Sequence, residues 1–308
     1  MKSVTWRSGP ARGRRPMREI VIISGKGGTG KTSLTGAFAH LAANKVVCDL
    51  DVDAPDLHLL LRPVREREER FLSGYEARID GERCTGCGVC ASLCRFDAIR
   101  EGERGYTVDP IRCEGCKVCV AFCPAEAIRF ELRHCGHWYV SSTRFGPMVH
   151  AQLFPGAENS GRLVMVLKQQ ARELATAKGL DLVLCDGAPG IGCPVISSLS
   201  GTHLAVAVTE PTPSGRHDLE RVADLCRHFQ VAFAVIINKH DLNQDEASRI
   251  EAYCRERDYP VLARLPHDPI VTRAMIQGLV VTELPEAAFS RELTSTWARI
   301  EALMNGIG

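Results

Sequence analysis

The chain has 308 residues, of which 45% are hydrophobic and 24% are charged, and its formal net charge at pH 7 is +1. This near-neutral balance gives no electrostatic argument for binding nucleic acid, and no apolar run reaches the roughly 18 residues that a membrane span needs. We therefore expect a cytoplasmic protein of about two domains, with no transmembrane segment and no nucleic acid partner.

The first 16 residues contain five basic residues and no apolar core, so they do not form a secretory signal. We expect residues 1–16 to be a disordered basic tail, or the result of a start site placed upstream of a true start at Met17. A basic arm that binds nucleic acid is the alternative.

An apolar run at residues 20–23 predicts a buried strand, and residues 34–43 predict a helix. The glycine-rich stretch between them has the spacing of a phosphate-binding loop, in which glycines let backbone N–H groups approach phosphate oxygens closely. Lys31 would reach the β- and γ-phosphates, and the Thr32 hydroxyl would bind Mg²⁺. The expected nucleotide-binding residues of this loop are Gly25, Lys26, Gly27, Gly28, Thr29, Gly30, Lys31, Thr32 and Ser33.

A second lysine, Lys26, stands near the start of this loop. With it, the pattern Gly-Lys-Gly-Gly-Thr-Gly-Lys-Thr resembles the deviant phosphate loop of the MinD, ParA and nitrogenase iron protein superfamily. The resemblance implies an ATPase with an α/β fold, built on a doubly wound, mostly parallel sheet. It also implies that Lys26 crosses a dimer interface to the partner's nucleotide, so that ATP favours a homodimer or a pair with a close paralogue. The alternative is that Lys26 is a solvated loop residue.

A second apolar run, residues 45–48, predicts a strand whose carboxyl end carries Asp49, Asp51 and Asp53. Ligands of open α/β sheets bind at this end of the strands. In the superfamily that the loop resembles, this segment is switch I (residues 49–57), and Asp51 matches the aspartate that positions the attacking water and contacts the Mg²⁺ shell. Asp49 and Asp53 are weaker candidates for that role, and aspartates that cap a helix are the alternative.

Two later strands are expected to end in residues of the same site. One leads to Asp186, which matches the Walker B aspartate that holds a Mg²⁺-bound water. The other leads to Asn238, which the resemblance makes an adenine ligand; a polar turn is the alternative. Upstream of both, we expect a strand at residues 163–166 and a helix at residues 168–178.

Eight of the 14 cysteines form two runs, each with two, two and three residues between successive cysteines, and the runs are 29 positions apart. This spacing resembles that of bacterial two-cluster ferredoxins, in which the fourth cysteine of each run binds the other cluster. Two [4Fe–4S] clusters are therefore expected, one on Cys84, Cys87, Cys90 and Cys123, and the other on Cys113, Cys116, Cys119 and Cys94. Two four-ligand zinc sites are the alternative.

The charged segment at residues 62–75 is expected to be a loop that ends the first part of the ATPase domain, residues 17–75. A ferredoxin-like α+β insert would follow at residues 76–133, and residues 134–308 would complete the ATPase domain. Cys135 stands between two histidines, for which we expect a structural role; part of a metal site is the alternative.

These patterns together predict an ATPase in which nucleotide-driven dimer closure is coupled to electron transfer through the clusters to an unidentified redox partner. The alternative is an ATP-gated protein that assembles or carries clusters for an acceptor protein, or positions a partner, with structural or sensory clusters of its own. Cluster lability separates the two, because a carrier transfers its cluster to an acceptor whereas a redox protein keeps both through cycles of reduction.

Overall fold

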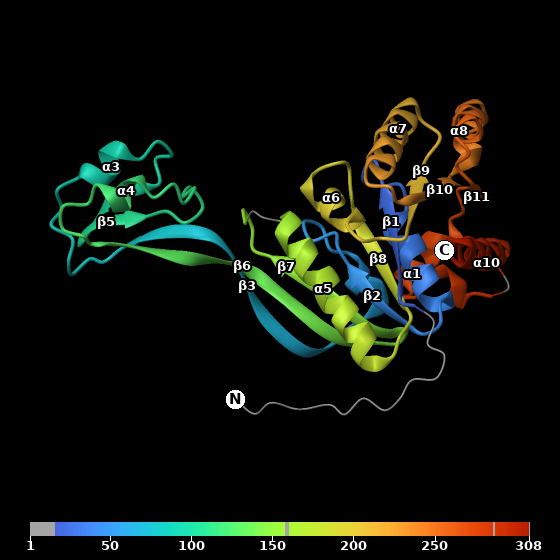
Figure 1. The fold of residues 1–308 in the computed structure, drawn as a ribbon, viewed down its shortest axis with the longest axis horizontal. Helices are drawn as coiled ribbons and strands as arrows, with labels where there is room; N and C mark the ends of the chain where they lie inside the picture. The colour runs from blue at the N-terminus through green and yellow to red at the C-terminus, as the bar shows by residue number, and fades with distance from the viewer. Residues whose placement is uncertain (1–15, 158–159, 286, 308) are drawn as a thin grey trace.

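The structure is a computed structural model that describes residues 16–157, 160–285 and 287–307. The basic tail expected at residues 1–16 lies outside the described residues, except for Pro16. Figure 1 shows a large α/β body and a small lobe, which a long two-stranded ribbon joins to the body. None of the described helices is both long and apolar enough to cross a membrane.

A mixed sheet forms the centre of the body. Within the described part of the chain it has nine strands: β1 Arg18–Ser24, β2 Lys45–Asp49, β3 Val64–Ile79, β6 Ile128–Thr143, β7 Gly146–Leu153, β8 Leu182–Pro189, β9 Leu204–Thr209, β10 Ala232–Asn238 and β11 Val261–Leu265. Their spatial order is β11-β10-β9-β1-β8-β2-β7-β6-β3. The strands from β11 to β7 pair in parallel, and β6 and β3 continue the sheet antiparallel.

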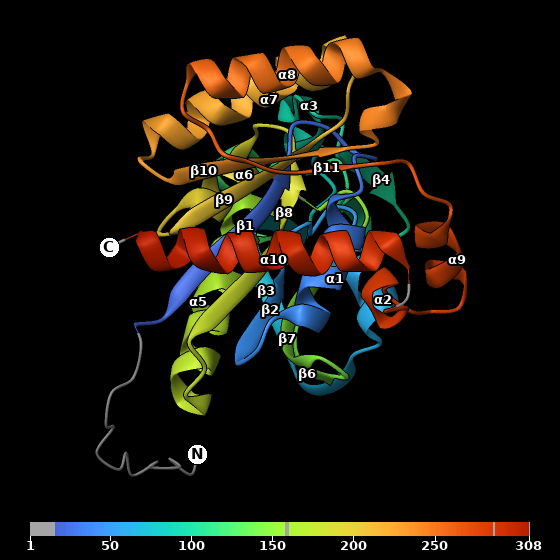
Figure 2. The same cartoon turned by 90° about the vertical axis from the view of Figure 1, so that its right-hand side faces the viewer.

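Helices cover both faces of this sheet, as Figure 2 shows for α7 and α8 on one side and α1 and α10 on the other. The first face packs against α5 Ser160–Lys178, α6 Cys193–Leu199, α7 Pro213–His228 and α8 Gln244–Glu256. The second packs against α1 Lys31–Leu41, α2 Leu57–Leu61, α9 Ile270–Ile276 and α10 Ala288–Gly306. Burial on both faces explains why the central strands are almost continuously apolar. The expected α/β fold with a mostly parallel sheet is confirmed.

The loop expected at residues 62–75 is wrong, because most of this segment belongs to the 16-residue strand β3. Its first half is exposed on both faces, so charged side chains occur without the alternation that marks a half-buried strand. Strand β6 supplies the backbone partners of β3 along the ribbon, and the two strands continue outward to the lobe (Figure 1). The expected domain boundaries at residues 76 and 133 therefore fall inside continuous strands.

The strand expected at residues 163–166 is also wrong, because this segment lies inside the 19-residue helix α5. Its buried positions include Leu163, Leu167, Ala171 and Ala175, which follow the helical spacing of three to four residues along one face. A run of four apolar residues is too short to show helical spacing, which appears only when the rest of α5 is included.

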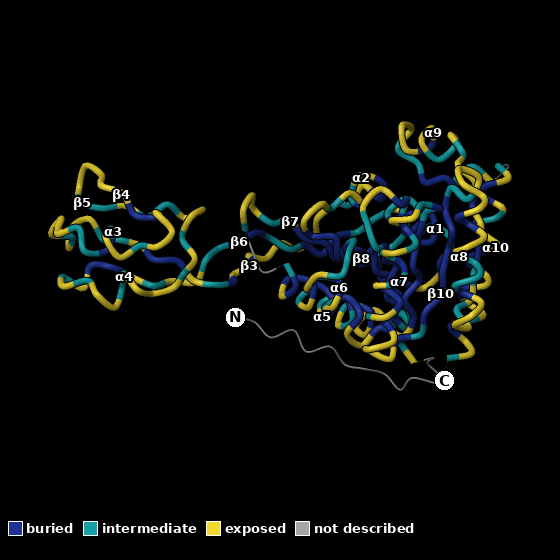
Figure 3. Tube along the Cα trace, turned by 90° about the horizontal axis from the view of Figure 1, so that it is seen from above, coloured by how far each residue is buried: buried dark blue, intermediate teal, exposed yellow. Residues whose placement is uncertain are grey.

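The lobe repeats one arrangement twice. After β3, a cysteine loop leads to α3 Val89–Leu93 and β4 Ile99–Gly102; then β5 Gly105–Val108, a second cysteine loop and α4 Val118–Ala121 lead into β6. Strands β4 and β5 form a separate hairpin. The two cysteine loops thus occupy matching places in the repeat, as the equal spacing of the two cysteine runs suggests. Figure 3 shows that the lobe is mainly half-buried or exposed, whereas the strands of the body are buried.

Candidate functional site

Lys31 occupies the centre of a cluster of acids at the carboxyl edge of the sheet. Its ammonium nitrogen is 3.3 Å from Asp51 Oδ2 and 3.0 Å from Asp186 Oδ1. Asp49 pairs in register with Asp186 on the neighbouring strand, and its Oδ1 accepts a hydrogen bond from the Asp51 backbone N–H. All four side chains are buried. The fold thus brings together three residues that the sequence predicted for nucleotide and Mg²⁺ binding, together with the weaker candidate Asp49.

The electrostatics of this cluster suit a divalent cation. Burial lowers the pKa of Lys31, but the carboxylates of Asp186 and Asp51 outweigh burial and raise it overall. Burial raises the pKa of Asp51 against the opposing effect of Lys31, and burial together with Asp186 raises the pKa of Asp49 well above its usual range. One oxygen each of Asp49 and Asp186 is buried without a hydrogen-bond partner among the described residues. The two unpartnered oxygens can accept hydrogen bonds from the water molecules that a Mg²⁺ ion keeps, so the ion does not need direct ligation by all three acids.

The phosphate loop (residues 24–33) leads directly into α1, whose first residue is Lys31. Gly30 has a φ of 90°, and a Cβ at this position would lie 2.5 Å from Asn238 Nδ2, so both backbone conformation and space require glycine. Thr35, one turn into the helix, donates to Asp186 Oδ1 at 2.9 Å. The start of α1 therefore lies beside the acid cluster, where the N–H groups of its first turn can bind phosphate oxygens.

Asn238, the candidate adenine ligand, contacts the phosphate loop itself. Its Nδ2 donates to the Thr29 carbonyl oxygen at 2.8 Å, and its Oδ1 accepts from the Lys239 backbone N–H at 3.1 Å. The Lys239 side chain donates to the Gly28 carbonyl oxygen at 3.0 Å. These contacts make β10 a support for the loop, and base recognition by Asn238 stays a prediction.

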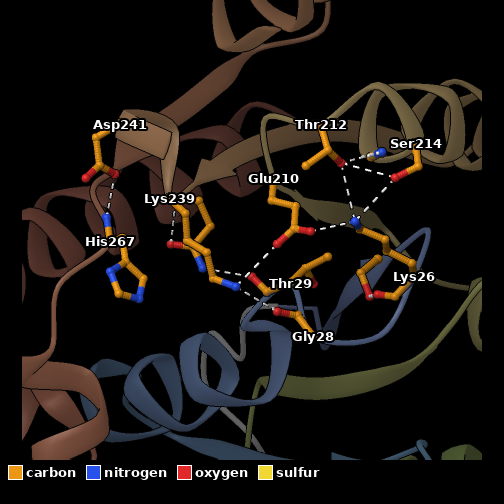
Figure 4. Close-up of polar contacts among 12 residues, drawn as sticks. Lys26, Gly28, Thr29, Glu210, Thr212, Ser214, Lys239, Asp241 and His267 are labelled. Carbon is orange, nitrogen blue, oxygen red and sulfur yellow. Dashed lines mark hydrogen bonds and ion pairs between the residues drawn. The ribbon is translucent and has the colours of Figure 1, made fainter. Parts of the chain in front are cut away.

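Lys26 is held by residues of its own chain (Figure 4). Its ammonium nitrogen is 2.5 Å from Glu210 Oε1 and lies within 3.5 Å of the hydroxyl oxygens of Thr212 and Ser214. Glu210 also pairs with Lys239, at 3.3 Å. Burial acts to raise the pKa of Glu210, but the hydrogen bonds from the two lysines outweigh it and lower that pKa.

Glu210 and its neighbours are functional candidates that the sequence analysis missed. Their signal was positional, because Glu210 directly follows β9 and so lies at the same carboxyl edge as Asp49 and Asp186. Its role as a partner of Lys26 depends on the order of strands in the sheet, which the sequence did not supply.

The eight cysteines of the two runs line two separate cavities in the lobe. One small cavity is lined by Cys84, Cys87, Cys90 and Cys123. The other is lined by Cys94, Cys113, Cys116 and Cys119. Each cavity thus takes three cysteines from one run and the fourth from the other, which is the grouping expected for crossed ligation.

The backbone of the two cysteine loops has the same geometry at matching positions. Gly86 and Gly115 both have positive φ, as do Gly88 and Lys117. Gly115 passes so close to the ribbon that a Cβ there would lie 2.3 Å from the Tyr75 carbonyl oxygen. The loops are therefore tightly turned, so that backbone N–H groups and sulfur atoms can face a shared centre.

Within the described residues, no three His, Cys, Asp or Glu side chains converge closely enough to hold a single metal ion. A [4Fe–4S] cluster makes a different demand, because each of its four cysteines binds a separate iron atom. Cys135 is buried at the base of the ribbon, where its sulfur donates to the Ser73 carbonyl oxygen at 3.1 Å. The rings of the flanking His134 and His137 stack on each other with centroids 4.7 Å apart. These contacts agree with the structural role expected for Cys135.

Comparison with known families relates most of the chain to one nucleotide-binding domain. Residues 20–281 match the family model described as the CobQ/CobB/MinD/ParA nucleotide binding domain. An uncharacterised protein of Methanocaldococcus jannaschii is 36% identical over 230 residues, which cover 73% of this chain and 79% of the relative. A second uncharacterised protein of the same organism is 23% identical and covers 74% of this chain and 82% of its own length.

Solved structures agree on the fold. The cell division ATPase MinD of Pyrococcus furiosus matches with a TM-score of 0.56 at 19% identity, over 93% of this chain and 99% of that one. MinD of Pyrococcus horikoshii, solved with Mg-ADP, matches with the same TM-score and identity, over 95% and 99%. At this level of identity the similarity concerns the fold alone.

Proposed function

The chain belongs to the CobQ/CobB/MinD/ParA nucleotide-binding family, and from this premise we propose that it is an ATPase that couples its nucleotide state to two [4Fe–4S] clusters held in the lobe. The acid cluster around Lys31 supports the ATPase, and the sorting of eight cysteines into two cavities supports the clusters. The cysteine sorting carries the proposal, because it is the feature that distinguishes this chain from a nucleotide-binding domain alone.

At the nucleotide site, ATP would change the partners of the side chains in the acid cluster. Lys31 exchanges the carboxylates of Asp51 and Asp186 for the β- and γ-phosphate oxygens of ATP, and the N–H groups at the start of α1 receive the same phosphates. Asp51, released from Lys31, can then orient the attacking water. Thr32 and water molecules held by the acids would bind Mg²⁺, which would neutralise charge on the phosphates.

In the lobe, the assigned ligands would be Cys84, Cys87, Cys90 and Cys123 for one cluster, and Cys94, Cys113, Cys116 and Cys119 for the other. The buried apolar core of the lobe is small: Ala77, Cys90, Ile99 and Ile128 form one cluster, and Ala98 and Ala127 are also buried. A core of this size does not stabilise a lobe unaided, so metal ligation would supply the missing stability. When bound, the clusters would accept and donate single electrons.

The ribbon gives the two sites a physical connection. Strand β3 begins three residues after α2, which is itself the continuation of switch I, and it runs without interruption to the first cysteine loop. A change in switch I on nucleotide binding would therefore reach the root of the ribbon. This arrangement favours nucleotide-controlled electron transfer, and a cluster carrier remains the second candidate because the ligands Cys87 and Cys116 are exposed.

Substitutions in the acid cluster separate binding from hydrolysis. Lys31→Ala is expected to weaken Mg-ATP binding by roughly a hundredfold or more, because charge-assisted contacts to the phosphates are lost. Asp51→Asn is expected to bind ATP but to hydrolyse it about a hundredfold more slowly, since water positioning is impaired. Equilibrium binding of a fluorescent ATP analogue and steady-state phosphate release measure the two effects.

The matched control is Asp53→Asn, which makes the same change two residues later on an exposed side chain. It is expected to leave both quantities near the wild-type value. An Asp51→Asn variant that hydrolyses ATP at the wild-type rate would show that another group positions the water.

A further inference from the structure

A further cavity, in the body, lies beside switch I. It is open to solvent and has a volume of about 490 Å³. One wall consists of Val52, Asp53, Pro55 and His58, from switch I and α2. The opposite wall consists of Arg65 on β3, Tyr139 on β6 and residues 150–157 from β7 and the loop that follows it. The cavity therefore lies between a nucleotide-sensing segment and the root of the ribbon.

Basic and aromatic side chains converge on this cavity. The Arg65 guanidinium carbon is 4.0 Å from the centre of the Tyr139 ring, and the His150 ring centroid is 5.0 Å from that of Tyr139. His150 is 7% exposed, and its Nε2 is 2.9 Å from Ser141 Oγ, which leaves Nδ1 for another partner. Burial, together with the smaller effects of the nearby His58 and Arg65, lowers the pKa of His150 to about 4. At neutral pH, His150 is thus an uncharged hydrogen-bonding group.

The charges around the cavity set the kind of ligand. Arg65 supplies the positive charge, and its closest acidic partner, Glu68, is 3.8 Å away, which is longer than a hydrogen bond. The exposed carboxylate of Asp53 stands on the facing wall. An arginine fork without a close partner suits a planar oxyanion. One arginine near two carboxylates favours a ligand group of charge −1 over a phosphate dianion.

We propose that this cavity binds a small organic carboxylate, with Arg65 donating two hydrogen bonds to the carboxylate and the exposed ring of Phe154 contacting its carbon skeleton. His150 and Gln152 line the same wall as hydrogen-bonding groups. The apolar residues of this wall give the ligand a surface to pack on, and the charge of Arg65 together with the hydrogen-bonding groups of His150 and Gln152 gives it orientation.

Occupation of this cavity is coupled to the nucleotide site through switch I. The wall residues Val52 and Asp53 directly follow Asp51, whose Oδ2 is 3.3 Å from Lys31 Nζ. When ATP replaces Asp51 as the partner of Lys31, the wall formed by Val52 and Asp53 moves, and the affinity of the cavity for the carboxylate changes. By linkage, the bound carboxylate changes the affinity of the protein for ATP by the same factor. This coupling rests on the proposed ATPase function, whereas carboxylate binding itself does not.

Calorimetric titration of the nucleotide-free protein tests this binding. The probes are two carboxylates, benzoate and succinate, and a third anion, inorganic phosphate. Arg65→Gln is expected to weaken carboxylate binding at least about tenfold, because a charged pair of hydrogen bonds is lost. Arg67→Gln is the matched control, since Arg67 lies on the same strand over the Trp138 ring and does not line the cavity. It is expected to bind both carboxylates like the wild type.

The proposal is overturned if neither carboxylate binds the wild type, or if Arg65→Gln binds them as well as Arg67→Gln does. It is also overturned if only phosphate shows binding that depends on Arg65. Repeating the titration with a non-hydrolysable ATP analogue tests the coupling, which fails if the carboxylate affinity is unchanged in a protein that binds the analogue. A chain that does not bind ATP would refute the proposed function while leaving the nucleotide-free result intact.

Discussion

The Cys123→Ala variant is expected to lose the cluster assigned to the first cysteine run and to keep the cluster assigned to the second, although Cys123 itself belongs to the second run. The reason is that Cys123 lines the same cavity as Cys84, Cys87 and Cys90. The wild type should hold about eight iron atoms per chain after anaerobic reconstitution, and the variant about four. Iron and sulfide analysis, together with electron paramagnetic resonance of the reduced protein, measures the loss.

Double variants make this test independent of the damage that any one substitution causes. Cys87→Ala combined with Cys123→Ala removes two ligands from one cavity and is expected to lose no more iron than either single variant. Cys87→Ala combined with Cys94→Ala removes one ligand from each cavity and is expected to lose both clusters. Ligation by consecutive cysteines predicts the reverse, because Cys87 and Cys94 would then bind the same cluster.

Cys193→Ala is the control for these variants, since Cys193 is exposed on α6 and lies in neither cavity. It should keep the full iron content. A wild-type protein with fewer than about six irons per chain, or with a stoichiometric amount of zinc, would contradict the cluster assignment itself.

Sites whose residues follow a fixed spacing within a short stretch of chain were predictable from the sequence. The phosphate loop and the cysteine runs each carry their geometry within a few residues, because the positions of glycines and ligands along the chain fix which groups can face one centre. The grouping of Asp51 and Asp186 around Lys31 was also within reach, since parallel strands place their carboxyl ends at one edge of the sheet.

Features that depend on pairing across the fold were not predictable in this way. Strand β3 reads as a charged loop because both of its faces are exposed near the ribbon root, and its hydrogen-bonding partner β6 follows only after the whole lobe. The contact of Lys26 with Glu210 depends on β9 lying next to β1, and the cavity near Arg65 depends on β6 and β7 extending the sheet beyond β2. In each case the decisive information is the order of strands, which no single segment contains.

A large effect is also expected from Lys26→Ala, which should bind ATP but fail to form the ATP-dependent dimer that the sequence resemblance implies. The phosphate loop already has Lys31 for the phosphates, and Lys26 instead turns to Glu210, Thr212 and Ser214 in the same chain. A lysine on a loop edge can exchange such partners for the phosphates of a facing nucleotide. By comparison with cationic groups supplied in trans, hydrolysis should slow by roughly a thousandfold.

Glu210→Gln tests the same contact from its other end. The substitution removes the charge that holds Lys26, and also weakens the pair between Glu210 and Lys239. If Glu210 competes with the partner's nucleotide for Lys26, this variant should dimerise at a lower concentration of a non-hydrolysable ATP analogue than the wild type does. The two substitutions therefore shift association in opposite directions, which a general loss of stability would not do.

Sedimentation velocity with the analogue, and separately with ADP, measures both shifts. The wild type should associate with the analogue and dissociate with ADP, because the repulsion between two facing nucleotides needs the trans lysines to offset it. Lys178→Ala, an exposed lysine at the end of α5, is the control and should behave as the wild type. If Lys26→Ala and Glu210→Gln both associate and hydrolyse ATP like the wild type, Lys26 is a solvated loop residue. If the wild type stays monomeric alone but associates with a related second chain, the trans contact is made between paralogues.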